Sequence, residues 1–373
     1  MDALRASTML LLVPAHAAGL IAVNGHEGAW STMVIWVIHV FRLPLFFAMS
    51  GFFLALMLSR RGLGGTARNR TTRIVVPLAV GMVTVMPLYL ALSQLTGLAI
   101  SDTHLPPEGS PVGFRLGFLW FLWDLLIIDA VAVVLFLLVP RGVARAGRWM
   151  RDALSKPVLG VAALAALTTV LLWPHEEWMA PASLEWVPDP VTLAYYALFF
   201  CLGATLYAHR EQLVTAAHRN AWRWFACALL AALPAAALFA LHNSPAYASR
   251  AHAPALFVYA VATWASLLAL VGLATRYLNR PRPRFRYMAD ASYWIYLSHL
   301  PAMVLLLALF GSLSTAPLFA IAVAGSLAAS LATYALFVRY TAIGRVLNGR
   351  RERPARHPAA AGEPPLPQPA ITR

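Results

Sequence analysis

Stretches of about 20 apolar residues recur along the whole chain, and arginine-rich segments separate many of them. Each stretch is long enough to cross the roughly 30 Å hydrocarbon core of a bilayer as an α-helix. Hydrophobic residues make up 60% of the 373 residues and charged residues only 12%, whereas about a quarter of a soluble domain is charged. The sequence therefore predicts an all-α, multi-pass membrane bundle without a soluble domain.

The apolar runs predict about ten transmembrane helices. Arginines gather after the second, fourth, sixth and eighth runs, whereas most acidic residues, among them Glu27, Asp102 and Glu185, lie in the other connections. Because positively charged loops stay in the cytoplasm, both termini are expected there. Residues 1–345 then form the membrane domain, and the Pro- and Ala-rich residues 346–373 form a disordered cytoplasmic tail. The expected spans are 3–23, 32–58, 74–100, 114–139, 157–173, 191–208, 222–241, 253–274, 290–310 and 316–340.

The formal net charge of +14 does not indicate a nucleic-acid-binding protein, because the arginines are divided among alternate connections and form no single patch. The lipid bilayer is the expected partner, and no nucleic acid is expected. The two cysteines, Cys201 and Cys227, lie in different apolar runs. Neither a disulfide framework nor a thiolate metal site is therefore expected.

The N-terminal segment has one feature of a secretory signal peptide. Ala15-His16-Ala17 has the form of a cleavage site and follows a short apolar run. Against cleavage, the positive region holds a single arginine, and Pro14 and His16 lie beside the would-be site. We therefore expect residues 3–23 to remain as the first span.

The first span carries two ionisable residues, which are costly inside a bilayer and therefore point to function. Arg5 and His16 are eleven residues apart, so they lie within about 20° of the same helix face and about 16 Å apart along the axis. Arg5 is expected at the cytoplasmic interface and His16 near the middle of the membrane. This arrangement suits an anionic group held at the inner surface and chemistry at greater depth.

The second span carries a second polar cluster, in the stretch IHVFRLPLFFAMSGFF. His39 and Arg42 are three residues apart on one helix face, and Asp124 in the fourth span lies at a similar expected depth. Two interpretations remain open: a structural ion pair between Arg42 and Asp124, or a role in contacting substrate. Ser50 and Gly51 are interpreted as a site of close helix packing.

Two further elements carry candidate residues. His299 lies in the middle of the predicted span 290–310 and precedes Pro301; it is either a catalytic partner or a hydrogen-bonded bridge between helices. Arg70 and Arg73 lie at the cytoplasmic start of the third span. Their guanidinium groups can bind phosphate oxygens bidentately.

Five stretches of the chain, given at the end of this paragraph, resemble the acyltransferase 3 family of ten-span integral-membrane acyltransferases and occur in the same order as in that family. Within the family, the chain most resembles the glucan succinyltransferase branch. An arginine, ten residues and a histidine on the first span form the family's best-known signature, and Arg5 and His16 fit it. One departure concerns a histidine that many members have before the Leu-Trp-Phe-Leu element, where this chain has Phe118-Leu119. The five stretches are LRASTMLLLVPAH, IHVFRLPLFFAMSGFF, RTTRIVVPL, LWFLWDL and ASYWIYLSHLP.

The resemblance implies a multi-pass protein of the bacterial inner membrane that passes an acyl group, succinyl or acetyl, from cytoplasmic acyl-CoA to a hydroxyl of a carbohydrate or glycan. It implies that His16 is the catalytic histidine and that Arg5 and Arg73 bind the donor. Acyl-CoA is then a co-substrate, and neither a bound cofactor nor a metal is expected. His16 could act as a general base or carry the acyl group itself.

A rival interpretation is a transporter or flippase of a sugar-containing or anionic substrate. It predicts that His39, Arg42 and Asp124 line a continuous path open to both sides of the membrane. The enzyme interpretation instead predicts a CoA-sized pocket on the cytoplasmic side that ends near His16, with His39, Arg42, Asp124 and His299 supporting it or contacting the acceptor.

Overall fold

The computed structural model describes residues 2–100, 116–175, 182, 185–242, 248–278 and 283–348, and in them the chain is helical almost throughout. The predicted tail beyond residue 348 lies outside the described residues. The α-helices are α1 (Asp2–Leu10), α2 (Leu12–Ile21), α3 (Ala29–His39), α4 (Arg42–Arg70), α5 (Val76–Val80), α6 (Met86–Thr96), α7 (Trp120–Leu138), α8 (Pro140–Ser155), α9 (Pro157–Leu172), α10 (Pro190–Ala208), α11 (Arg210–Arg219), α12 (Ala221–His242), α13 (Ala248–Tyr277), α14 (Pro283–Phe310), α15 (Thr315–Thr333) and α16 (Ala342–Asn348).

Eight helical stretches of the described chain are long and apolar enough to cross a membrane, which confirms an all-α, multi-pass membrane bundle. One of them, Ala29–Thr96, contains 68 residues and covers two predicted spans. It turns at Gly62, whose φ of 65° favours glycine. Pro157–Leu172 is a shorter apolar helix. The number of ten crossings and the cytoplasmic location of both termini stay predictions.

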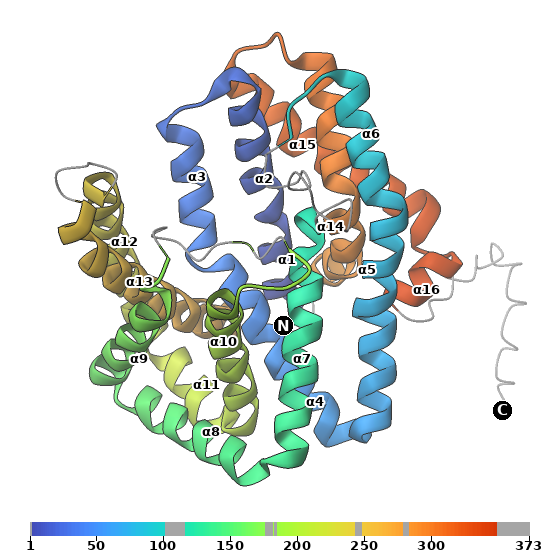
Figure 1. The fold of residues 1–373 in the computed structure, drawn as a ribbon. Coiled ribbons are helices and arrows are strands. Elements are labelled where there is room, and N and C mark those ends of the chain that lie inside the picture. The colour runs from blue at the N-terminus through green and yellow to red at the C-terminus, as the bar shows by residue number, and fades with distance from the viewer. Residues whose placement is uncertain are drawn as a thin grey trace, which may run out of the picture.

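The helices form two groups that meet along α4, α7 and α10 (Figure 1). In one group α13 packs against α9, α11 and α12, and in the other α14 packs against α1, α6 and α15. The contact between α4 and α10 joins the groups and is very close. A Cβ atom at Gly51 would overlap the carbonyl group of Phe200, and one at Gly203 would overlap that of Ala48. The packing interpretation of Gly51 is thus confirmed.

The second predicted span is broken in the structure, whereas the sequence suggested a continuous helix. α3 ends at His39 and α4 begins at Arg42, with φ −127° and ψ −22° at Phe41 between them. Pro44 provides the physical reason, because it has no N–H to donate to the carbonyl of Val40. The break places Arg42 in the first turn of a new helix.

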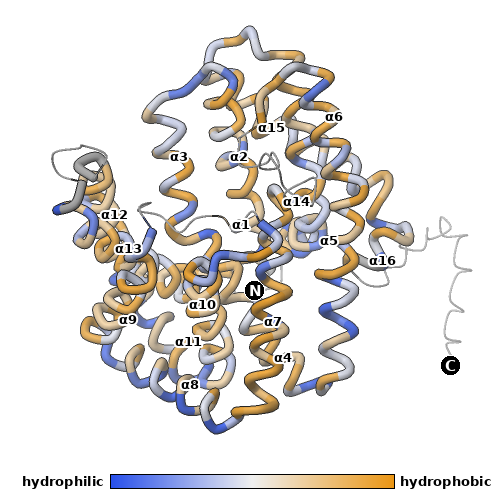
Figure 2. Tube along the Cα trace, in the orientation of Figure 1, coloured by the Kyte–Doolittle hydropathy of each residue, from blue (hydrophilic) through white to orange (hydrophobic). Residues whose placement is uncertain are grey.

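The connection after α7, predicted as a loop, forms the amphipathic helix α8. Met150 and Leu154 face the protein, whereas Arg141, Arg145 and Arg148 are exposed. Hydrophilic residues gather along α8 and around the C-terminal end of α4, at the lower end of the bundle in Figure 2. A basic amphipathic helix of this kind suits the interface between a membrane and water.

The start of α10, which packs against α4, is fixed by a capping carboxylate. The backbone N–H of Thr192 donates to the Asp189 carboxylate (2.7 Å), and Nε2 of His175 lies 3.1 Å from the same oxygen. Burial by itself raises the pKa of Asp189, but the hydrogen bonds from Thr192 and the neighbouring His175 outweigh burial and hold the pKa below its ordinary value. Asp189 therefore stays ionised and stabilises the N-terminus of α10.

Candidate active site

A cavity of about 380 Å³ lies where α1, α2, α4, α7 and α14 meet. This volume is in the range of about 300–1,000 Å³ that is usual for small-molecule sites. Of the predicted site residues, Arg5, His16, Arg42 and Arg73 line the cavity, although they come from four separate segments. The structure therefore brings together the residues to which the resemblance assigned chemistry and donor binding.

One end of the cavity, which we call the arginine end, is lined by five arginines. The guanidinium group of Arg5 lies over the ring of Tyr293, 4.9 Å from its centroid, so a cation–π contact orients it. Guanidinium groups form paired hydrogen bonds with phosphate oxygens. The arginine end is thus suited to a ligand with several phosphate groups. Its arginines are Arg5, Arg60, Arg61, Arg70 and Arg73.

The opposite end, which we call the histidine end, is lined by His16 and Arg42, and His299 lies behind His16. Nδ1 of His16 lies 3.1 Å from Nε2 of His299, although the two residues are 283 positions apart in the sequence. His299 is fully buried, and its Nδ1 lies 3.0 Å from the carbonyl oxygen of Ile295. His299 does not belong to the cavity lining, so it supports His16 from behind.

Arg42 projects into the cavity from the first turn of α4. Only 2% of the residue is exposed, and its Nε and Nη1 atoms have no hydrogen-bond partner among the described residues. Its Nη2 atom is 3.5 Å from Nε2 of His39, whose Nδ1 lies 2.9 Å from the carbonyl oxygen of Ile35. His39 thus orients Arg42 but does not line the cavity. A buried guanidinium with unused donors is suited to a small anionic group.

The ion pair considered between Arg42 and Asp124 is not formed. Asp124 is fully buried, and neither carboxylate oxygen has a hydrogen-bond partner within the described ranges. Arg42 faces the cavity, whereas Asp124 is not part of its lining. Tyr196 on α10 interacts electrostatically with both. The two charges match in expected depth, but only Arg42 lines the cavity, which spacing along the sequence could not reveal.

Arg70 and Asp129 form an ion pair that was not predicted from the sequence. Nε of Arg70 lies 3.2 Å from the carboxylate of Asp129, and the side chains are 15% and 5% exposed. Arg70 also donates to the carbonyl oxygen of Ser50 (3.0 Å). The sequence contained a sign of this pair, because Asp129 is the second acidic residue of an otherwise apolar helix and therefore needs a partner. The pair fixes a cavity-lining arginine between α4 and α7.

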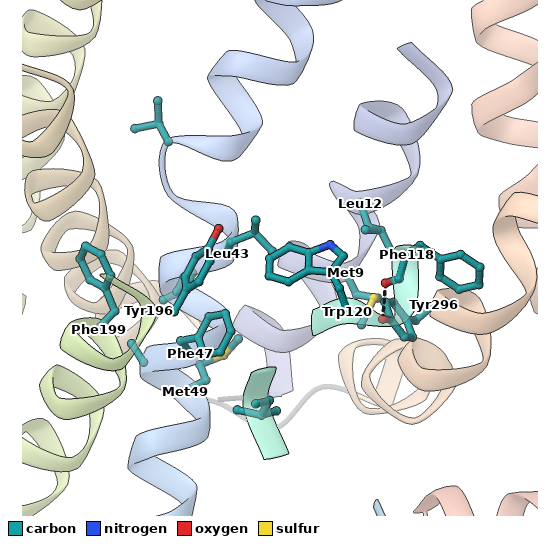
Figure 3. Packing of buried hydrophobic residues seen from close by; sticks show 14 of the residues in the cluster. Met9, Leu12, Leu43, Phe47, Met49, Phe118, Trp120, Tyr196, Phe199 and Tyr296 are labelled. Atoms are coloured by element: carbon teal, nitrogen blue, oxygen red, sulfur yellow. Dashed lines mark hydrogen bonds between the residues drawn. The ribbon is translucent and has the colours of Figure 1, made fainter. Parts of the chain in front are cut away.

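Aromatic residues close the cavity wall beside the histidines. The Tyr296 hydroxyl donates to the carbonyl oxygen of Phe118 (2.6 Å), as drawn in Figure 3, where Met9 and Trp120 lie next to this contact. The rings of Phe118 and His299 are edge to face, with centroids 6.0 Å apart. Phe118 is part of the position where many acyltransferase 3 members carry a histidine. In this chain an apolar ring packs there, so this position supplies no proton-transferring group.

The geometry supports one class of chemistry well. A polyanion can bind at the arginine end while its uncharged reactive part extends toward His16. A neutral imidazole at that depth can take a proton from an attacking hydroxyl, and the apolar wall limits access of water. The cavity therefore combines a cluster of arginines, suited to an anionic ligand, with a histidine suited to proton transfer.

Comparisons with known proteins identify the family of the chain. Residues 1–335 match the acyltransferase 3 family, described as an acyltransferase domain. The chain is 25% identical over 332 residues to glucans biosynthesis protein C of Salmonella gallinarum, and 25% identical over 334 residues to that of Salmonella typhimurium; each match covers 81% of both chains. No solved structure matches the chain significantly. The match over most of its length shows that this chain, a multi-pass membrane acyltransferase, belongs to the acyltransferase 3 family.

Proposed function

We propose that the protein is an O-acyltransferase of the bacterial inner membrane. It transfers an acyl group from cytoplasmic acyl-CoA to a hydroxyl of a carbohydrate or glycan acceptor. One observation carries the proposal: a single cavity joins five arginines at one end to His16 at the other. The similar proteins named for glucan biosynthesis support a carbohydrate acceptor.

Acyl-CoA suits the two ends of the cavity because its charge and its reactive bond lie far apart. The nucleotide part bears phosphates, which Arg5, Arg73 and their neighbours would bind. The thioester lies at the tip of a long, flexible and uncharged arm. Donor binding at the arginine end would therefore deliver the thioester toward His16.

The proposed reaction uses His16 as a general base. Nε2 of His16 takes the proton of the acceptor hydroxyl while the oxygen attacks the thioester carbonyl carbon. The carbon–sulfur bond then breaks, and the departing CoA sulfur takes the proton from His16. The products are the acyl ester and free CoA, and His16 is regenerated in its neutral form.

The surroundings of Arg42 favour succinyl over acetyl as the acyl group. A succinyl chain ends in a carboxylate, which could accept the unused hydrogen bonds of the buried guanidinium. Arg42 and His16 line the same cavity, so a carboxylate bound by Arg42 would share this space with the reacting centre. An acetyl group offers Arg42 no such partner.

The transport interpretation receives less support from the geometry. It requires His39, Arg42 and Asp124 to line one path, but only Arg42 of the three lines the cavity. Asp124 is fully buried and does not line the cavity, so for this residue we propose a supporting role behind the site and not a contact with the acceptor.

The proposal is tested with the purified protein in lipid nanodiscs, with succinyl-CoA or acetyl-CoA as donor and a glucan oligosaccharide as acceptor. Release of free CoA and formation of the acylated sugar should both depend on His16 and both be faster with succinyl-CoA. His209→Ala removes a histidine outside the cavity and serves as the matched control. Acylation at an undiminished rate by His16→Ala would overturn the mechanism, and sugar movement without acylation would favour transport.

A further inference from the structure

We infer that His299 is a positioning residue that fixes both the ring orientation and the tautomer of His16, so that the lone pair of His16 lies on Nε2. The inference rests on the proposed role of His16, which it deepens. The Ile295 carbonyl, His299 and His16 then form a chain of hydrogen bonds between the first and ninth predicted spans. Each step follows from which atoms can donate and which can only accept.

His299 forms a hydrogen bond with a carbonyl group of its own helix. A carbonyl oxygen can only accept a hydrogen bond, so the 3.0 Å contact between Nδ1 of His299 and the oxygen of Ile295 requires a proton on Nδ1. His299 is completely buried, and a positive charge on a buried ring without an anionic partner would be costly. A neutral ring protonated on Nδ1 carries its lone pair on Nε2.

The rings of His299 and His16 are in direct contact through one nitrogen of each ring. Nε2 of His299, which carries the lone pair, must accept in the 3.1 Å contact with Nδ1 of His16. Nδ1 of His16 is then the protonated nitrogen, and Nε2 of the neutral ring holds the lone pair. The orientation of a base by a group on its other nitrogen is the same physical device that carboxylates and carbonyls provide in other histidine sites.

The third step concerns what holds His299 in place. The ring of Phe118 packs edge to face against it. On the opposite side of α14, Ser298 donates to Ser330 (2.8 Å) and Trp294 donates to Thr333 (2.8 Å), both on α15. These contacts set the rotation of α14 about its axis. His299 is therefore a fixed acceptor that aligns the ring of His16.

Two substitutions separate positioning from packing. In His299→Gln the side-chain oxygen can reach the place of Nε2 and accept from His16, whereas His299→Leu fills similar space without an acceptor. We expect His299→Leu to lower kcat by about 100-fold with little change in the KM for acyl-CoA, and His299→Gln to retain most of kcat. His218→Leu, which removes a histidine between α11 and α13, is the control. Equal loss in the Leu and Gln variants, or no loss in the Leu variant, would overturn the inference.

A second measurement does not depend on activity. Solid-state nitrogen NMR of the native protein with labelled histidine distinguishes protonated from unprotonated ring nitrogens. The His16 signals are identified by their loss in His16→Gln. We expect a protonated Nδ1 and an unprotonated Nε2 on His16, and the reverse assignment would overturn the inference. Failure of the proposed function is recognised separately, because His16→Ala would then still transfer the acyl group.

Discussion

The two ends of the cavity differ in how many ionisable side chains they contain and in how deeply these side chains are buried. At the arginine end, five guanidinium groups from α1, α4 and the following segment surround one space. At the histidine end, Arg42 and His299 are almost completely buried, and each contact is made by one side chain. At the arginine end, several arginines can therefore bind the same anionic ligand. At the histidine end, proton transfer and binding of a small anion each depend on a single side chain.

This difference follows from where charge can be tolerated. Near the membrane surface, long arginine side chains reach water and lipid head groups, so several can be placed together at modest cost. At depth, every charge or polar group needs a specific partner. A single substitution should accordingly have small effects at the arginine end and large effects at the histidine end.

The largest expected effect is at His16. His16→Ala should lower acyl transfer by about 10²–10⁴-fold, the usual contribution of a general base, because no other side chain takes the proton. Donor affinity should change little, since phosphate binding lies at the other end. Single-turnover transfer and direct titration with acyl-CoA measure the two quantities. A parallel loss of both would mean that the ends are not separate.

The next effect is at Arg42 and depends on the donor. Arg42→Gln should reduce kcat/KM for succinyl-CoA by about 10- to 100-fold, since one charged hydrogen-bonded contact contributes about 1.5–3 kcal/mol. The value for acetyl-CoA should stay nearly unchanged, and Arg42→Lys should recover part of the preference. Competition between the two donors gives the ratio directly. The same loss with both donors would show that Arg42 does not recognise the acyl carboxylate.

A smaller effect is expected at Arg5, because its neighbours share its task. Arg5→Ala should raise the KM for acyl-CoA by about fivefold, which corresponds to about 1 kcal/mol, and Arg5→Lys should recover part of the affinity. Combination with Arg73→Ala should multiply the increases. Arg276→Ala is the matched control, since Arg276 also lies over a tyrosine ring, Tyr277, but outside the cavity. A large fall in kcat for Arg5→Ala would assign it a part in the reaction itself.

The smallest effect is expected from salt. Between low and physiological ionic strength, the KM for acyl-CoA should rise about two- to threefold, because exposed charges are screened. The preference for succinyl over acetyl should stay constant, because Arg42 is buried and poorly screened. Initial rates at several salt concentrations test both statements. A preference that falls with salt would place the acyl carboxylate at the arginine end.

The site could be predicted where residues share a helix and not where helices meet. Arg5 on α1 and His16 on α2 could be placed on one face because both helices lie in one helical span, Ala3–His26, in which the helical repeat fixes their relation. Arg42 and Asp124 were matched by depth alone, and the structure separates them. Asp129 went unrecognised as the partner of Arg70, because the sequence shows that a buried acid needs a partner but not which helix provides it. The helix break before Arg42 was also not predicted, although Pro44 in the sequence indicated it.

The sequence alone determined that the chain is an all-α membrane protein and that the first span carries an arginine and a histidine suited to chemistry. Hydrophobic length and helical periodicity act within one segment, so they can be read from the order of residues. The tertiary structure decided that His16 meets His299 at 3.1 Å, that Arg42 faces a cavity, and that Phe118 occupies the wall beside them. These contacts depend on how separate helices rotate, break and pack against one another, and no local pattern in the sequence specifies that.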